Sequence, residues 1–234
     1  MDPDRIADAI ARRAELAPEQ GVAWVAGLDP AFSSDPFGLC IVGRDPTNYQ
    51  RLLVGLAQAW KPTKRKATSF DERREVEDAV LAEVAAVCLS YGARVVTDQY
   101  AAKPIIDFLS RRGLTVRTVA MTAASKTAAF AEVRARLNTG ALELYDNPDL
   151  LAELRRLRTK HTAGAASVVN PRVGGSHGDL AQALALATFE HADRPAAAPG
   201  VTASFGHLPP YGDLTGGVIL GGLRDPVTGE DCVF

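Results

Sequence analysis

The order of secondary-structure patterns along the chain is the feature that most restricts its fold. Three β-type apolar runs come first, at residues 22–28, 38–42 and 51–60, and short polar links separate them. Consecutive strands with short links favour an antiparallel meander. From residue 70 onward, helical and strand patterns alternate instead. The sequence therefore predicts an α/β fold in which three antiparallel strands are followed by parallel strands, with helices flanking one mixed sheet.

The alternating part of the chain begins with a predicted helix at 70–89 and ends with another at 177–190. Between them we expect strands at 93–97, 116–121, 141–145 and 167–170, and helices at 104–112, 125–137 and 148–158. This order, with a carboxylate on a late helix, indicates a mixed sheet flanked by helices.

Composition suggests three parts in the chain. Residues 1–20 include a predicted amphipathic helix at 3–17 and are interpreted as an N-terminal helix or linker remnant. Residues 21–193 would form the main domain, large enough to bury one substantial core. Residues 194–234 are rich in Pro, Ala and Gly without a sustained apolar period, which predicts a flexible or loosely packed tail.

Charge and cysteine content exclude several classes of protein. The formal net charge of −2 argues against a globally basic nucleic-acid binder, so any contact with DNA must come from local basic patches. Three widely spaced cysteines without a CxxC pair argue against a zinc site and a disulfide framework, and favour a reducing cytoplasm. The sequence has no signal-peptide pattern and no long apolar segment, so we expect a soluble protein without membrane contact.

Three aspartates occupy positions where chemistry is expected. Asp29 follows the first predicted strand, Asp98 follows the strand at 93–97, and Asp179 lies in the first turn of the last predicted helix. A ribonuclease H-like sheet would place the two strand ends side by side and bring the late helix across them. Three adjacent carboxylates repel one another unless cations compensate their charge. Oxygen ligands select Mg²⁺ or Mn²⁺, and one or two such ions would support phosphodiester hydrolysis.

Each aspartate also has an ordinary structural interpretation. An Asp after a strand is commonly a turn residue, and an Asp in the first turn of a helix interacts favourably with the helix dipole. Position alone leaves both interpretations open.

Three motifs carry a family resemblance over residues 22–192. The segments 27–31 (GLDPA), 95–100 (VVTDQY) and 177–179 (HGD) resemble the nuclease domain of tailed-phage terminase large subunits. The resemblance implies that Asp29, Asp98 and Asp179 coordinate catalytic metals. It also implies that Asp35 assists a second metal, although Asp35 lies in an ordinary turn sequence. His177 would orient a water or contact DNA, or simply cap a helix.

The resemblance implies an endodeoxyribonuclease that uses Mg²⁺ or Mn²⁺ to cut concatemeric viral DNA during genome packaging, in the cytoplasm of an infected host cell. Its expected partners are double-stranded DNA, an ATPase motor domain, the portal and the small terminase subunit. The sequence lacks the GxxxxGKS or GxxxxGKT phosphate loop of P-loop motors. The chain would therefore be either an excised nuclease domain or a stand-alone relative.

Basic residues gather in two places that could contact DNA phosphates. The first cluster follows the third predicted strand and comprises Lys61, Lys64, Arg65 and Lys66. The second ends the helix predicted at 148–158 and comprises Arg155, Arg156, Arg158, Lys160 and His161; a solvated helix end explains it equally well. No aromatic stripe accompanies these charges, which favours backbone contact to duplex DNA over base stacking.

Other functions remain open from the sequence alone. A resolvase- or transposase-like nuclease of the same fold would use similar acids on branched or recombining DNA. A non-catalytic module that binds DNA or the portal would keep the fold without the chemistry. An actin-like ATPase shares the sheet topology, but it requires a glycine-rich phosphate turn after the first acid, where this chain has Pro30-Ala31-Phe32.

Overall fold

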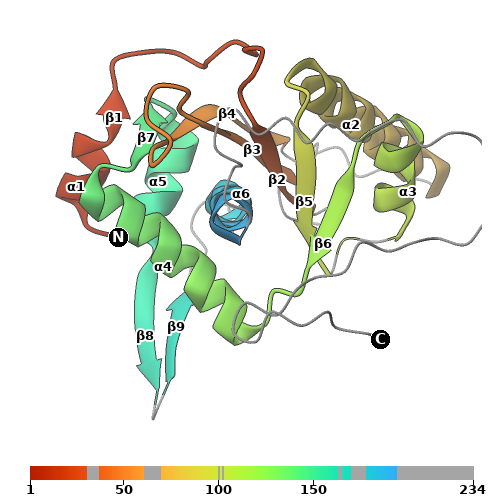
Figure 1. Ribbon diagram of the computed structural model, residues 1–234. Helices are drawn as coiled ribbons and strands as arrows, with labels where there is room; N and C mark the ends of the chain where they lie inside the picture. Colours follow the sequence, from red (N-terminus) through yellow and green to blue (C-terminus); the bar gives the residue numbers. More distant parts are fainter. Residues whose placement is uncertain are drawn as a thin grey trace, which may run out of the picture. The chain divides into compact units, whose positions relative to one another are not determined.

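The computed structural model describes residues 1–30, 37–60, 70–99, 101, 103–162, 165–169 and 178–193. These residues form a seven-stranded mixed sheet with helices on both faces, together with a separate two-stranded hairpin (Figure 1). The predicted fold class is confirmed. The tail predicted at 194–234 lies outside the described residues.

The large sheet has the strand order β1-β7-β4-β3-β2-β5-β6. Strands β2, β3 and β4 form the predicted antiparallel meander, and the remaining neighbours in the sheet pair in parallel. The strands are β1 (Ile10–Ala11), β2 (Trp24–Asp29), β3 (Phe37–Arg44), β4 (Leu52–Trp60), β5 (Arg94–Asp98), β6 (Val116–Val119) and β7 (Leu142–Tyr145). Strands β2 and β3 are almost continuously buried, because helices cover both of their faces.

Two hydrophobic clusters lie on opposite faces of this sheet. Alternate side chains of β2 separate them: Val25 packs toward one cluster, and Ala26 and Leu28 toward the other. The Val25 face is covered by α4 (Ala123–Thr139), α5 (Pro148–Arg156) and α6 (Asp179–Asp193). The opposite face is covered by α2 (Phe70–Ser90) and α3 (Lys103–Arg111). Figure 1 shows α6 end-on, between α4 and the sheet.

Two glycines allow α6 to lie directly on the sheet. A Cβ atom placed on Gly27 of β2 would lie 1.9 Å from the backbone oxygen of Ala183, and one placed on Gly38 of β3 would lie 2.5 Å from that of Asp179. No side-chain rotation can relieve a collision with backbone atoms. The height of α6 above β2 and β3 therefore depends on glycine at both positions.

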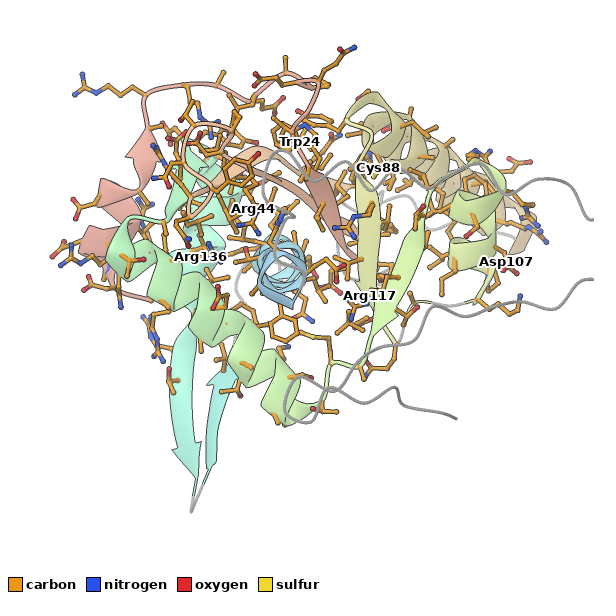
Figure 2. The ribbon with its side chains drawn as sticks, in the orientation of Figure 1. Trp24, Arg44, Cys88, Asp107, Arg117 and Arg136 are labelled. Carbon is orange, nitrogen blue, oxygen red and sulfur yellow. The ribbon has the colours of Figure 1, made fainter. Side chains whose placement is uncertain are left out.

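The C-terminal end of α6 is held by polar contacts. Buried Glu190 forms ion pairs with Arg117 of β6 and with Arg94 of β5, the latter at 3.7 Å. Arg44 Nη2 donates a hydrogen bond to the carbonyl of His191 at 2.9 Å. Figure 2 labels Arg44 and Arg117, the two arginines that contact the end of α6 from different strands. Burial lowers the pKa of His191 to about 4, so its neutral ring can donate from Nε2 to the Val42 carbonyl, 3.0 Å away. These contacts prevent α6 from sliding along its axis relative to the sheet.

The N-terminal segment differs from the sequence prediction. The helix predicted at 3–17 is short: α1 spans Pro3–Asp8, with the Asp2 side chain capping its start. Residues Ile10 and Ala11 instead form β1, which pairs in parallel with Leu144 and Tyr145 of β7. The helix prediction was wrong beyond residue 8, because the unpaired edge of β7 offers hydrogen bonds that a short amphipathic pattern cannot reveal.

The region after α5 also differs from expectation. Helix α5 ends at Arg156, and β8 (Arg158–Thr162) and β9 (Ala165–Val169) form an antiparallel hairpin that extends away from the large sheet (Figure 1). The sequence predicted only one short strand, at 167–170. Leu157 has an extended backbone, φ −54° and ψ 129°, which ends the helix two residues before the predicted end.

None of the helices in the described part of the chain combines the length and apolar character that spanning a membrane requires.

Candidate metal centre

Sheet register brings two of the predicted aspartates together. Strands β2 and β5 are adjacent and parallel, with Leu28 opposite Thr97. Asp29 and Asp98 are the last residues of these two strands, so they lie at the same end of the sheet. This is the edge at which the carboxyl ends of parallel strands commonly carry binding sites.

The third predicted aspartate reaches this edge from α6. Gly38 pairs with Asp29 across the β2–β3 ladder, and a Cβ atom on Gly38 would lie 3.1 Å from the Asp179 Cβ atom. Helix α6 begins at Asp179, whose side chain is buried, and the backbone N–H of Gln182 donates to the Gly178 carbonyl at 2.8 Å. Gly178 has φ +88°, a left-handed conformation that glycine adopts without strain. The structure therefore gathers Asp29, Asp98 and Asp179 from three separate elements.

A fourth acid, Glu153, joins this group and was missed by sequence reasoning. Glu153 lies in α5 and is 5% exposed, and its Oε2 accepts a hydrogen bond from the backbone N–H of Ala181 at 2.8 Å. That N–H is in the first turn of α6, where side-chain acceptors and negative charge are both favourable. The one available signal was its position among the buried leucines of α5, Leu150, Leu151 and Leu154.

The raised pKa of Asp29 indicates that these acids lie close enough to act on one another. Burial, followed by the charges of Asp179 and Asp98, raises the pKa of Asp29 to about 8. The charge of Glu153 acts in the same direction, whereas Lys126 of α4 acts in the opposite one. Asp29 therefore keeps its proton at neutral pH while the acids are uncompensated.

The donor chemistry of these residues suits a hard divalent cation. All four acids supply carboxylate oxygens, the ligands that Mg²⁺ and Mn²⁺ prefer. As the described residues stand, however, no three His, Cys, Asp or Glu side chains are arranged to hold one metal ion. The acids are near enough to influence one another's protonation, but they do not form a closed coordination shell in this structure.

The remaining predicted site residues have different outcomes. Asp35, His177 and the basic cluster at Lys61, Lys64, Arg65 and Lys66 lie outside the described residues, so their roles stay predictions. Of the second basic group, Arg158 donates from Nη1 to the carbonyls of Arg155 at 2.9 Å and Leu157 at 3.3 Å. These bonds close the end of α5, which favours the helix-end interpretation. The side chains of Lys160 and His161 are not among those described.

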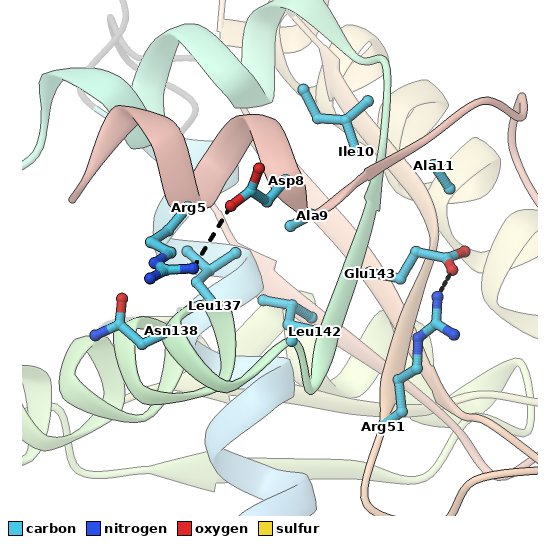
Figure 3. Close-up of a pocket in the computed structure, with 11 residues that line it drawn as sticks. Arg5, Asp8, Ala9, Ile10, Ala11, Arg51, Leu137, Asn138, Leu142 and Glu143 are labelled. Carbon is cyan, nitrogen blue, oxygen red and sulfur yellow. Dashed lines mark hydrogen bonds and ion pairs between the residues drawn. The ribbon is translucent and has the colours of Figure 1, made fainter.

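One pocket among the described parts of the chain lies away from the acids. It has a volume of about 170 Å³ and lies between α1, β1, the end of α4 and β7 (Figure 3). Its lining includes Leu142, which pairs with Leu52 at the end of the sheet opposite Asp29. Its charges are paired within the lining, Arg5 with Asp8 and Arg51 with Glu143. This pocket therefore supplies no alternative active site.

Replacement of Glu153 tests how α6 is positioned. We expect Glu153→Ala to lower the free energy of unfolding by about 1–3 kcal/mol, because the buried Ala181 N–H loses its acceptor. Glu153→Gln should cost much less, since an amide oxygen still accepts that hydrogen bond. Chemical denaturation of both variants measures the difference. Equal losses of stability in the two variants would show that the charge of Glu153, and not its hydrogen bond to α6, stabilises the fold.

Comparison with known proteins identifies the fold. The large-terminase nuclease of thermophilic phage G20c with bound magnesium aligns with a TM-score of 0.61 and 19% identity over 80% of this chain and 95% of that one. The HK97 bacteriophage large terminase aligns with a TM-score of 0.62 and 15% identity over 80% of this chain and 42% of that one. The nuclease domain of the large terminase from bacteriophage SPP1 with bound Mn aligns with a TM-score of 0.51 and 14% identity, covering 77% and 94%.

No protein-family model matches the sequence, and no curated protein matches it. The similarity is therefore one of structure: the chain has the ribonuclease H-like fold of terminase nuclease domains.

Proposed function

We propose that this chain is a metal-dependent DNA endonuclease that cuts concatemeric viral DNA during genome packaging. One observation carries the proposal: Asp29, Asp98 and Asp179 converge at one edge of a sheet whose fold is that of terminase nuclease domains. The raised pKa of Asp29 supports the proposal. Buried acids whose pKa is shifted by neighbouring charges are typical of functional sites.

Asp29, Asp98 and Asp179 would hold one or two divalent cations, and Asp35 would assist with the second. When bound, such ions lower the pKa of a water and stabilise charge on the leaving oxygen of a phosphodiester. Structures of similar terminase nucleases hold magnesium, manganese, cobalt or zinc, which supports a divalent cation at this site.

The protein's own residues prepare the site for this chemistry. Asp29 must release its proton before it can act as a ligand, so cation binding and loss of that proton are coupled. Glu153 fixes the first turn of α6 and thereby the position of Asp179. The two glycines beneath α6 keep that helix close to β2 and β3. These contacts hold Asp179 at the edge of the sheet that carries Asp29 and Asp98.

The proposal extends to partners. Duplex DNA would be held through backbone phosphates by Lys61, Lys64, Arg65 and Lys66, and His177 would contact DNA or orient a water. The match to the HK97 large terminase covers 42% of that protein, so there the same fold is part of a longer chain. An ATPase motor domain, the portal and the small terminase subunit would accordingly be partners in the infected host cell.

Substrate form separates this proposal from its nearest rival. We expect the wild-type chain to cut linear and circular duplex DNA with Mn²⁺ at comparable rates, because phosphate contacts carry no sequence or junction information. Cleavage rates on synthetic four-way junctions and on matched linear duplexes, followed on denaturing gels, measure whether the enzyme prefers a junction. Strong selectivity for the junction would instead indicate a resolvase-like enzyme.

A further inference from the structure

Lys126 lies in the first turn of α4, at the same edge of the sheet as the acids. The chain leaves β6, which pairs with β5 so that Val119 lies opposite Asp98, and enters α4 at Ala123. Gln99, the residue after Asp98, clamps this connection. Its Oε1 accepts from the Met121 N–H at 2.5 Å, and its Nε2 donates to the Met121 carbonyl at 3.5 Å. The start of α4 is thus tied to the strand end that carries Asp98.

The charge of Lys126 acts on the acid site. Its side chain is half-buried, and it is the cation that acts on Asp29 against the surrounding carboxylates. No described residue forms a hydrogen bond or an ion pair with the Lys126 ammonium. Lys126 is therefore close enough to influence the acids, while its donors are not consumed by them.

The stability of α4 does not explain a lysine at this position. Thr122 caps the helix, and a positive charge in the first turn opposes the helix dipole. Lys103 offers a direct contrast, because it also lies in a first turn, that of α3. Lys103 has a partner in its own helix: its Nζ lies 2.6 Å from Asp107 Oδ2, one turn later. Lys126 has the same unfavourable interaction with the helix dipole, but no such partner in its own helix.

We infer that Lys126 binds a backbone phosphate of the DNA strand that enters the acid site. The inference rests on the proposed nuclease function and adds a substrate-binding residue to it. A phosphate that approaches Asp29, Asp98 and Asp179 is repelled by them, and an ammonium beside them provides the opposing attraction. Lys126 would hold non-bridging phosphate oxygens through charge-assisted hydrogen bonds and would transfer no proton.

The test compares Lys126→Ala and Lys126→Arg with the matched control Lys103→Ala. In metal-free buffer, the affinity for a duplex oligonucleotide is measured over a salt series. We expect Lys126→Ala to bind more weakly and the slope of log K against log salt to fall by about one. With Mn²⁺, its kcat/KM for cleavage should fall by about 100-fold. Lys126→Arg should retain most of both properties, and Lys103→Ala should match the wild type.

Two results would overturn the inference. One is a salt slope for Lys126→Ala equal to that of the wild type and of Lys103→Ala. The other is tighter binding of Mn²⁺ by Lys126→Ala with unchanged DNA affinity, which would show that the lysine only balances the acids. If Lys126→Ala fails to fold, Lys126→Gln takes its place. A wild-type chain that binds DNA but does not cut it would contradict the proposed function, and the salt series would still decide the role of Lys126.

Discussion

Asp29→Asn is expected to abolish metal-dependent DNA cleavage and at the same time to stabilise the metal-free protein at alkaline pH. The pKa of Asp29 is raised from 3.8 to about 8 in the folded chain, first by burial and then by Asp179 and Asp98. Between these values the folded state keeps a proton that the unfolded state releases. The free energy of unfolding therefore falls as pH rises through this range, and the loss is complete above about pH 8.

The size of this effect follows from the same linkage. One pKa unit corresponds to about 1.4 kcal/mol, so ionising Asp29 destabilises the folded state by on the order of 6 kcal/mol. Asparagine has a similar shape and no charge, so it removes the loss. Thermal unfolding in EDTA should show the variant gaining stability over the wild type as pH increases. Asp8→Asn serves as the control for loss of an exposed carboxylate. Identical curves for Asp29→Asn and wild type would contradict a buried acid cluster.

Gly27→Ala is expected to destabilise the protein by about 3 kcal/mol, at the upper end of the usual cost of overpacking. The added methyl carbon would lie 1.9 Å from the Ala183 carbonyl oxygen and 2.9 Å from the Ala187 nitrogen, so α6 must move away from β2. For a domain of this size, that loss lowers the Tm by about 6–12 °C. Asp179 moves with α6, so cleavage should fall as well.

Gly21→Ala is the matched control for this substitution. Gly21 has φ +83°, but a Cβ atom there would meet nothing within 4 Å. This variant should therefore show only the backbone cost of about 1 kcal/mol. If Gly27→Ala were no less stable than Gly21→Ala, close packing of α6 on the sheet would be ruled out.

Local pattern was sufficient to predict six of the seven strands of the sheet and the strand ends that carry Asp29 and Asp98. The apolar runs ending near Asp29 and Asp98 are long enough to define strands, and parallel strands place their carboxyl ends at one edge. Asp179 could be placed at a helix start for similar reasons, while its approach to Asp29 required the family resemblance.

The features that were missed depend on contacts between distant parts of the chain. The two-residue strand β1 exists because β7, more than 130 residues later, offers it a pairing edge. Glu153 is a buried acid only because α6 presents the N–H of Ala181 to it. Gly27 belongs to a recognisable motif, yet nothing in its neighbours indicates that a helix backbone will rest on it. No local pattern carries information of this kind.

Metal-dependent cleavage by the wild-type chain and by Asp98→Asn tests the central claim most directly. Supercoiled plasmid is incubated with Mg²⁺, Mn²⁺ or Ca²⁺, and exposed Asp107→Asn serves as the control for loss of a carboxylate. We expect the wild type and Asp107→Asn to nick and linearise the plasmid with Mg²⁺ or Mn²⁺, and Asp98→Asn to remain folded without cutting. Cleavage that is independent of the metal, or that survives Asp98→Asn, would contradict a nuclease centred on these acids.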